Sequence, residues 1–345
     1  MRKFLSFILK CIAAGIVSMV LLSIFALVYY NPPIAIEQKD GTTNFKYIPD
    51  SAWTFMLEGV GFGKTDALGY NNAYYKNLTN PDIVVMGSSH MEGLQVPANK
   101  NCIYLLNELF DKDNLSYNDF KCFNLGASGH FLGVTSSNFQ YIANRYKDSK
   151  YLIIEVSELE FSDSMLEDII SDEYRTPFED KGVIQEAAQK VPFIRLLYKK
   201  INEIKSAKPT SPEVSVESVK TDKKDEIDNY SAKMNVILEE ISSLSRENNI
   251  KTIILIHERF WENKDRKIET EIDTRYKTAF LKCCELNNIK VIDATPDMIK
   301  AYKENYVTSY GFSNTTPGEG HLNEAGHSII AKTLYHYING LEENK

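Results

Sequence analysis

The stretch Asp82-Ile83-Val84-Val85-Met86-Gly87-Ser88-Ser89-His90-Met91-Glu92-Gly93 joins a short apolar run to a polar turn that two glycines enclose. A short apolar run that ends at glycine is typical of a buried strand. Gly87 and Gly93 permit a tight turn and helix entry, so Ser89 is expected at a helix N-terminus. In an open parallel sheet, ligands bind at the carboxyl ends of the strands. This stretch therefore predicts an α/β fold with a site at its turn.

The rest of the chain repeats this pattern of apolar runs and amphipathic helices. The other expected strands cover residues 121–124, 151–156, 252–256 and 290–292. The expected helices cover about 102–111, 132–147, 227–247, 270–287 and 323–339. Such alternation predicts a parallel sheet with helices on both faces. We expect a three-layer α/β/α domain of the flavodoxin-like kind over residues 81–340.

Two segments do not fit the alternation. Residues 31–80 are rich in aromatic side chains but have no clear period, and we treat them as a lead-in to the domain. Residues 158–226 form an expected insertion between the third and fourth strands. It comprises an acidic part (158–172), a basic amphipathic helix (about 183–205) and a stretch rich in Ser, Pro and charge (206–225). The last part has little to bury, which predicts a flexible loop.

The N-terminus carries an uncharged apolar run over residues 11–30. At about 1.5 Å per residue this run matches the thickness of a bilayer core. Arg2, Lys3 and Lys10 precede it, which predicts a cytoplasmic tail (1–10), a transmembrane anchor (11–30) and an extracytoplasmic remainder. A cleaved signal peptide is the alternative, but its apolar region is usually shorter and ends in small residues, whereas this run ends in Tyr29-Tyr30.

Charge and cysteine content exclude some classes of partner. The net charge is −8 and no concentrated Lys/Arg face is visible, so we expect no nucleic-acid partner. Four cysteines follow the anchor, and their number leaves the pairing open, with a bridge between Cys102 and Cys122 as one alternative.

His257-Glu258 begins a zinc-protease pattern, yet Trp261 stands where the second histidine is required. We predict no metal and no cofactor.

Two further polar segments complete the expected site. After the second strand, Gly126 and Gly129 interrupt the chain, and a glycine at such a bend exposes a backbone N–H of the kind an oxyanion hole needs. Near the C-terminus, His321 precedes the final helix. A serine requires a neighbouring base to be nucleophilic at neutral pH, and histidine can serve. We therefore predict Ser89 as the nucleophile and His321 as its base.

These segments, in this order, resemble the SGNH/GDSL hydrolase superfamily. The family's Gly-Asp-Ser-x-x-x-Gly block is matched by residues 87–93, with Ser88 in place of the aspartate, and its His-Leu-Asn-x-x-Gly-His continuation by residues 321–327. The resemblance, over residues 82 to about 335, implies an SGNH-type fold with Ser89 as nucleophile and His321 as catalytic base. It also implies that the backbone N–H groups of Ser89 and Gly129 hold the oxyanion.

The sequence departs from the family pattern at two places. The aspartate three residues before the histidine is replaced by Gly318, so Glu319 becomes the candidate carboxylate, with a backbone carbonyl as the alternative. The Gly-x-Asn-Asp block should follow the third strand, where residues 156–160 read Val-Ser-Glu-Leu-Glu. One lost oxyanion donor costs about 3–4 kcal/mol. Three histidines are candidates for lining the substrate site, with a structural role as the alternative for each: His90, His130 and His257.

The anchor, the Gly-Ser-Ser opening and the missing third block together resemble one branch of the superfamily. That branch contains the teichoic-acid D-alanylation and alginate O-acetylation proteins, which work beside membrane-embedded acyltransferases. The resemblance implies a membrane-anchored serine esterase or acyltransferase that acts on O-acyl groups of a cell-envelope polysaccharide or teichoic-acid-like polymer, with a membrane-bound acyltransferase as a candidate partner. The alternative is a non-catalytic envelope binding or scaffold protein with the same fold.

Overall fold

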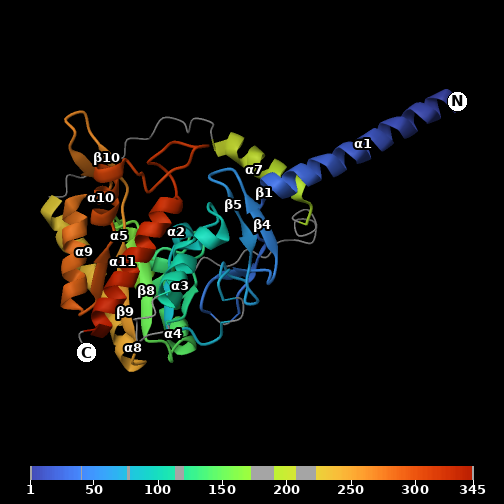
Figure 1. The fold of residues 1–345 in the computed structure, drawn as a ribbon. Coiled ribbons are helices and arrows are strands. Elements are labelled where there is room, and N and C mark those ends of the chain that lie inside the picture. The colour runs from blue at the N-terminus through green and yellow to red at the C-terminus, as the bar shows by residue number, and fades with distance from the viewer. Residues whose placement is uncertain are drawn as a thin grey trace.

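The computed structural model describes residues 2–39, 41–75, 78–112, 120–171, 190–206 and 223–343. Its centre is a parallel five-stranded sheet with the order β12-β9-β8-β6-β7 (Figure 1). The strands are β6 (Ile83–Met86), β7 (Cys122–Asn124), β8 (Tyr151–Val156), β9 (Lys251–Ile256) and β12 (Lys290–Asp293). All five expected strands are present, and the predicted fold class is confirmed.

Helices cover both faces of this sheet, which explains why its strands are apolar without alternation. In β6, Val84 and Met86 belong to one core, while Ile83 and Val85 belong to the other. The first core is covered by α4 (Leu132–Arg145), α5 (Asp163–Ile170), α8 (Lys223–Glu247) and α9 (Thr274–Leu286). The second is covered by α3 (Cys102–Lys112), α10 (Thr295–Asn305) and α11 (Glu324–Glu343). Burying each large apolar side chain contributes about 1.5–3 kcal/mol.

The lead-in is part of the folded domain. It forms two small antiparallel sheets, which contain β1 (Tyr30–Asn31), β4 (Ala52–Phe55) and β5 (Gly61–Lys64), and β2 (Ala35–Glu37) and β3 (Phe45–Tyr47). Their strands are two to four residues long, too short to leave a readable period in the sequence. Tyr47 and Trp53 pack against Leu94 and Ala98, which follow the turn after β6. The lead-in therefore lies against the edge of the sheet where the site was predicted.

The remaining short elements are α2 (Ser89–Glu92), the 3₁₀ helix η1 (Ala98–Lys100) and the hairpin of β10 (Phe260–Glu262) and β11 (Ile268–Thr270). All five cysteines are free thiols, so no bridge joins Cys102 to Cys122. The Cys102 thiol instead lies 3.8 Å from the sulfur of Met91. Burial raises the pKa of the Cys102 thiol to about 12, as expected for an unreactive core cysteine.

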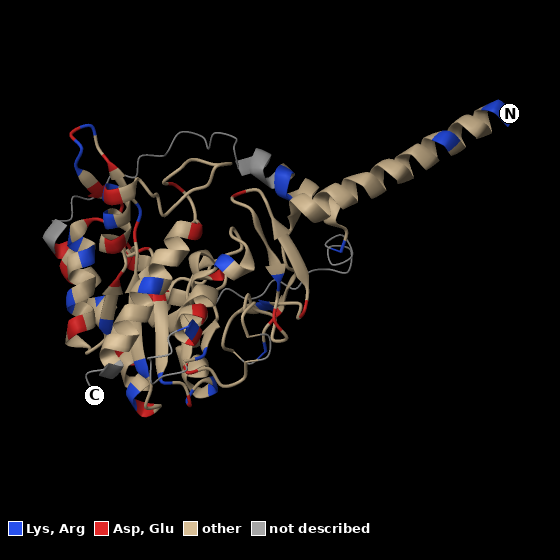
Figure 2. Cartoon of the chain, in the orientation of Figure 1, with Lys and Arg blue, Asp and Glu red and all other residues tan. Residues whose placement is uncertain are grey.

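Helix α1 (Arg2–Tyr29) extends away from the domain (Figure 1). Its mean hydropathy reaches 2.7, and it is long and apolar enough to cross a membrane. Its basic residues lie toward its N-terminal end (Figure 2). From the insertion, residues 192–206 form helix α7 (Pro192–Ser206), which packs beside the C-terminal end of α1. The rest of the helix expected from about residue 183, and most of the expected loop over 206–225, lie outside the described residues.

Candidate active site

Ser89 is the first residue of α2, directly after the carboxyl end of β6. Ser88 caps this helix, because its hydroxyl accepts a hydrogen bond from the His90 N–H (3.3 Å). The Ser88 N–H in turn donates to Glu155 Oε2 (2.7 Å) at the end of β8. Gly93 ends the helix with φ +64°, and a Cβ there would lie 2.3 Å from Asn101 Nδ2. The turn that presents Ser89 is thus held at both ends.

The structure brings Ser89 and His321 together. Ser89 Oγ lies 2.9 Å from His321 Nε2, although the two residues are 232 positions apart in the chain. His321 stands in the loop before α11, and this loop is tied to the first turn because the Leu322 N–H donates to His90 Nδ1 (3.3 Å). This distance allows the imidazole to accept the proton of the serine hydroxyl.

The carboxylate that orients His321 comes from Glu58. Glu58 Oε2 lies 2.7 Å from His321 Nδ1, and Oε1 accepts the His321 backbone N–H at 2.7 Å. The expectation for Glu319 is wrong in this respect, since its side chain is exposed and lines a neighbouring pocket, while Glu58 contacts the imidazole. Gly318 has φ +87°, a backbone conformation that would be strained for an aspartate at this position. The carboxylate that is missing from the C-terminal block is therefore supplied by the lead-in.

Glu58 is held by the turn between β4 and β5. The side chain of Asn314 bridges this turn, because it accepts from the Gly59 N–H (2.9 Å) and donates to the Gly59 carbonyl (3.1 Å). Gly320 has φ +77°, and a Cβ there would lie 2.3 Å from Glu58 Oε1. Burial alone would raise the pKa of the Glu58 carboxyl, but the hydrogen bonds from His321 outweigh it and lower that pKa. Glu58 is thus held as a carboxylate beside the imidazole.

The loop that follows β7 completes the environment of Ser89. Gly129 has φ +79°, and a Cβ there would meet no other atom within 4 Å. The Ala127 N–H donates to the Gly87 carbonyl (3.0 Å), which fixes the loop beside the turn after β6. Across the described part of the chain, neither the Ser89 N–H nor the Gly129 N–H donates a hydrogen bond. Both groups are available to a bound oxyanion.

Glu92 connects this loop to the lead-in. Its fully buried carboxyl accepts hydrogen bonds from the hydroxyls of Tyr47 and Ser128. Burial raises the pKa of Glu92 above its ordinary value, while those hydrogen bonds oppose the rise. Gly126 packs so closely that a Cβ would lie 2.5 Å from the Glu92 backbone nitrogen. Glu92 therefore positions the segment that carries Gly129.

The three other candidate histidines take structural positions. His90 packs its ring against His321 (5.3 Å between centroids) and accepts the Leu322 N–H. His130 is buried against Phe45, and burial lowers the pKa of its imidazole to about 4. His257 is fully buried. His130 and His257 therefore do not line an open substrate site as proposed from the sequence, because other side chains separate them from solvent.

His257 belongs to a buried network behind Ser89. Its Nε2 lies 3.0 Å from Glu155 Oε1, and its Nδ1 lies 2.6 Å from the Tyr310 hydroxyl. Burial would raise the pKa of Glu155, but the hydrogen bond and charge of His257 lower it to about 2. Glu155 also accepts the Ser88 N–H, so this network supports the turn that carries Ser89.

We expect Glu155→Gln to destabilise the fold by about 3 kcal/mol, because it removes a fully buried carboxylate that contacts His257 Nε2 and accepts the Ser88 N–H. The measurement is urea unfolding of the full chain in detergent at neutral pH. Glu158→Gln, three residues along and exposed, is the matched control and should change stability by less than about 0.5 kcal/mol. Equal stabilities of the two variants would contradict the role of Glu155.

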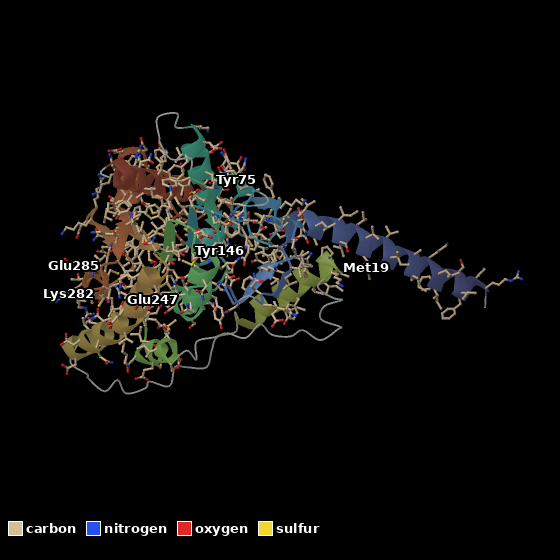
Figure 3. The ribbon with its side chains drawn as sticks, turned by 90° about the horizontal axis from the view of Figure 1, so that it is seen from below. Met19, Tyr75, Tyr146, Glu247, Lys282 and Glu285 are labelled. Atoms are coloured by element: carbon tan, nitrogen blue, oxygen red, sulfur yellow. The ribbon has the colours of Figure 1, made fainter. Side chains whose placement is uncertain are left out.

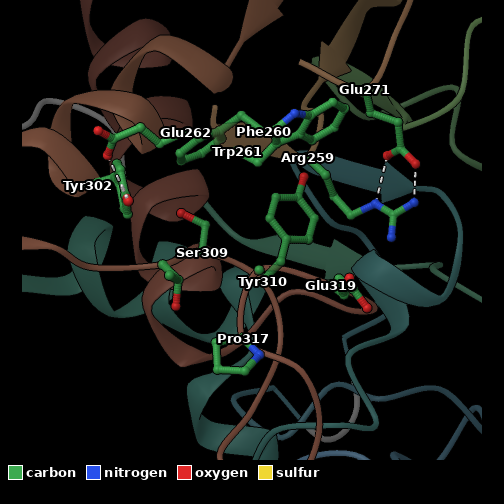
Figure 4. A pocket seen from close by; sticks show the side chains of 12 residues that line it. Arg259, Phe260, Trp261, Glu262, Glu271, Tyr302, Ser309, Tyr310, Pro317 and Glu319 are labelled. Carbon is green, nitrogen blue, oxygen red and sulfur yellow. Dashed lines mark hydrogen bonds and ion pairs between the residues drawn. The ribbon is translucent and has the colours of Figure 1, made fainter. Parts of the chain in front are cut away.

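A pocket of about 450 Å³ adjoins the loop that carries His321 (Figure 4). Gly318 and Glu319, just before His321, form part of its wall. The side chains in its wall are mainly aromatic and acidic: Phe260, Trp261, Tyr302, Tyr310, Glu262, Glu271 and Glu319. Arg259 also lines it and is paired with Glu271 through its Nε (2.7 Å). The pocket therefore carries an excess of negative charge.

No family model matches the sequence, and no curated protein matches it. Several solved structures are similar in architecture. An acetyl xylan esterase has a TM-score of 0.41 and 14% identity, over 74% of this chain and 99% of that one. A lipolytic G-D-S-L family member from Veillonella parvula has a TM-score of 0.37 and 14% identity (74% and 96% covered). An alpha/beta hydrolase from the metagenome of Lake Arreo has a TM-score of 0.38 and 12% identity (78% and 98%). These likenesses concern the architecture alone.

Proposed function

We propose that this chain is a membrane-anchored SGNH-type serine esterase or O-acyltransferase that acts on O-acyl groups of a cell-envelope polymer. The observation that carries the proposal is the line of contacts from Ser89 Oγ to His321 Nε2 (2.9 Å) and from His321 Nδ1 to Glu58 Oε2 (2.7 Å). A nucleophile, a base and a group that orients the base are the parts that acyl transfer through serine requires.

In the proposed reaction, Ser89 Oγ attacks the ester carbonyl while His321 Nε2 takes the hydroxyl proton. The negative charge then moves to the carbonyl oxygen, where the Ser89 and Gly129 N–H groups stabilise it. Glu58 stabilises the imidazolium, which returns its proton to the departing alcohol as the ester bond breaks. The acyl-serine is released by water in an esterase or by a sugar hydroxyl in a transferase, and His321 removes the proton of that acceptor.

Membrane anchoring through α1 is supported by its length, its apolar surface and the position of its basic residues. The first charged residues, Arg2, Lys3 and Lys10, lie on the N-terminal side of the apolar run. This asymmetry favours a cytoplasmic N-terminus and an extracytoplasmic site. In that arrangement the site faces envelope polymers and would work beside a membrane-bound acyltransferase partner.

The pocket beside His321 favours a neutral sugar over a polyanion as the group that flanks the acyl ester. Trp261 exposes 49% of its surface, and an aromatic face can pack on the apolar face of a sugar ring. The carboxylates of Glu262 and Glu319 can accept hydrogen bonds from sugar hydroxyls, while they repel phosphate and uronate groups. Between the two polymer classes named above, this charge favours the polysaccharide.

The proposal is tested by incubating the full chain in detergent with an O-acetylated neutral polysaccharide, and separately with an acylated phosphodiester polymer. We expect acyl release from the polysaccharide, faster than from the phosphodiester polymer, and loss of that release in Ser89→Ala. Release at the same rate by Ser89→Ala would overturn the mechanism. Binding of the polysaccharide without any release or transfer would favour a non-catalytic scaffold.

A further inference from the structure

Helix α7 carries an apolar stripe that the described part of the chain leaves exposed. Ile194, Leu197, Tyr198 and Ile201 expose between 40% and 66% of their surfaces. Their spacing of i, i+3, i+4 and i+7 places all four on one face of the helix. The charged residues Arg195, Lys199 and Lys200 lie outside this stripe. An exposed apolar face of this kind indicates that the helix contacts a protein partner or a membrane.

The place of α7 in the molecule points to that occupant. The Arg195 guanidinium donates to the Pro32 carbonyl (2.8 Å) and to the side chain of Asn31, so α7 is bound to the chain that leaves α1. Figures 1 and 3 show α7 beside the same end of α1 from two directions. Along α1, Ala26 is buried and Ser23 half-buried, whereas Met19 exposes 59% of its surface. The domain thus covers one side of the last two turns of α1.

The length of the anchor sets the depth of this contact. The apolar run 11–30 is about 30 Å long at 1.5 Å per residue, equal to the hydrocarbon core, so Tyr29 and Tyr30 lie at its outer surface. Ser23 and Ala26 are then about 10 and 6 Å below the level of Tyr30. An element that packs against those turns lies at the boundary between headgroups and acyl chains, into which amphipathic helices bury their apolar face by about 5–10 Å.

We propose that the apolar stripe of α7 inserts into the outer surface of the lipid bilayer and fixes the orientation of the catalytic domain on the membrane. The inference rests on the proposed anchoring through α1. Strand β4 and the residue after it join the anchor α1 to the catalytic domain. The Thr54 hydroxyl donates to the Leu27 carbonyl (2.6 Å), and the Met56 N–H donates to the Tyr29 carbonyl (3.0 Å). Glu58 comes two residues after Met56, so the orientation of the anchor also determines where the active site lies above the bilayer.

The experiment uses the full chain in phosphatidylcholine–phosphatidylglycerol vesicles, with and without acyl chains brominated near the headgroup. Tyr198→Trp places a fluorophore in the stripe, and Tyr306→Trp places one at an 81% exposed site at the end of α10, a helix that Figure 1 shows across the domain from α7. The parent chain provides the background from Trp53 and Trp261. We expect brominated lipid to remove most of the added emission of Tyr198→Trp and to leave that of Tyr306→Trp unchanged.

Unquenched emission from Tyr198→Trp at long wavelength would place the stripe in water, and unquenched emission at short wavelength would place it under protein, either a partner or a second copy. Either result overturns the proposal, as does equal quenching of both variants or failure of the chain to float with the vesicles. Acyl release, measured on the same vesicles, tests the proposed function separately, because neither tyrosine belongs to the site.

Discussion

Replacing Glu58 with glutamine is expected to lower kcat for hydrolysis of a small activated ester by about 10⁴-fold. The amide keeps the size of the carboxylate, but it can donate to His321 Nδ1 and so favour the tautomer in which Nε2 carries the proton. That tautomer cannot accept the proton of Ser89. The amide also lacks the charge that stabilises the imidazolium, so the effect should appear mainly in kcat.

Glu319→Gln is the matched control for this prediction. It makes the same chemical change two residues before His321, at the carboxylate that the sequence suggested. Because the Glu319 side chain is exposed and does not contact the imidazole, we expect kcat within about twofold of the parent on the small ester. A large loss in Glu319→Gln together with a near-normal Glu58→Gln would reverse the assignment. Circular dichroism establishes that both variants are folded.

The buried histidines His130 and His327 are together expected to remove about 4 kcal/mol of stability from the fold between about pH 7.5 and pH 5. Burial lowers the pKa of His130 to about 4 and that of His327 to about 3, from 6.5. The unfolded chain therefore binds more protons below about pH 6.5, and stability falls as the pH falls. Each histidine contributes about 2 kcal/mol at pH 5, and burial lowers the pKa of His90 as well. A loss of this size would bring a domain of ordinary stability close to unfolding.

Urea unfolding of the full chain at the two pH values measures this loss. His327→Asn should reduce the difference by about 2 kcal/mol, because asparagine can still accept the Cys102 N–H that His327 Nδ1 now accepts (3.3 Å) but cannot be protonated. His336→Asn, on the exposed side of the same helix, should leave the difference unchanged. Below about pH 4.5, protonation of Glu155, whose pKa is lowered to about 2, should destabilise the fold further. A pH-independent stability would contradict the burial of these groups.

The parallel sheet could be predicted because its strands are buried on both faces, and an apolar run such as Ile83 to Met86, which is short and ends at a glycine, is typical of a buried strand. The pairing of Ser89 with His321 could also be predicted, since each belongs to a recognisable local pattern at the same edge of the sheet. These features depend on residues that are close in sequence or on the rules of parallel sheets.

Glu58 could not be predicted in the same way. It stands 263 positions from His321, in a lead-in whose strands are too short to show a period. One signal was present: the acidic residue Glu58 stands directly before the glycines of Gly59-Val60-Gly61, which permit a tight turn. The burial of His257 could not be predicted from the sequence for a similar reason. Its partners Glu155 and Tyr310 come from distant segments of the chain. Sequence proximity favoured Glu319, whereas the geometry of the folded chain favours Glu58.

The central claim is that Ser89, His321 and Glu58 form one reactive unit. The most direct test is the rate at which a fluorophosphonate modifies the folded full chain, with the modified peptide identified by mass spectrometry. We expect modification at Ser89 in the parent and at an equal rate in Glu319→Gln, a much slower rate in Glu58→Gln, and none in Ser89→Ala. An unmodified Ser89 in the folded parent, or equal rates in the parent and Glu58→Gln, would contradict it.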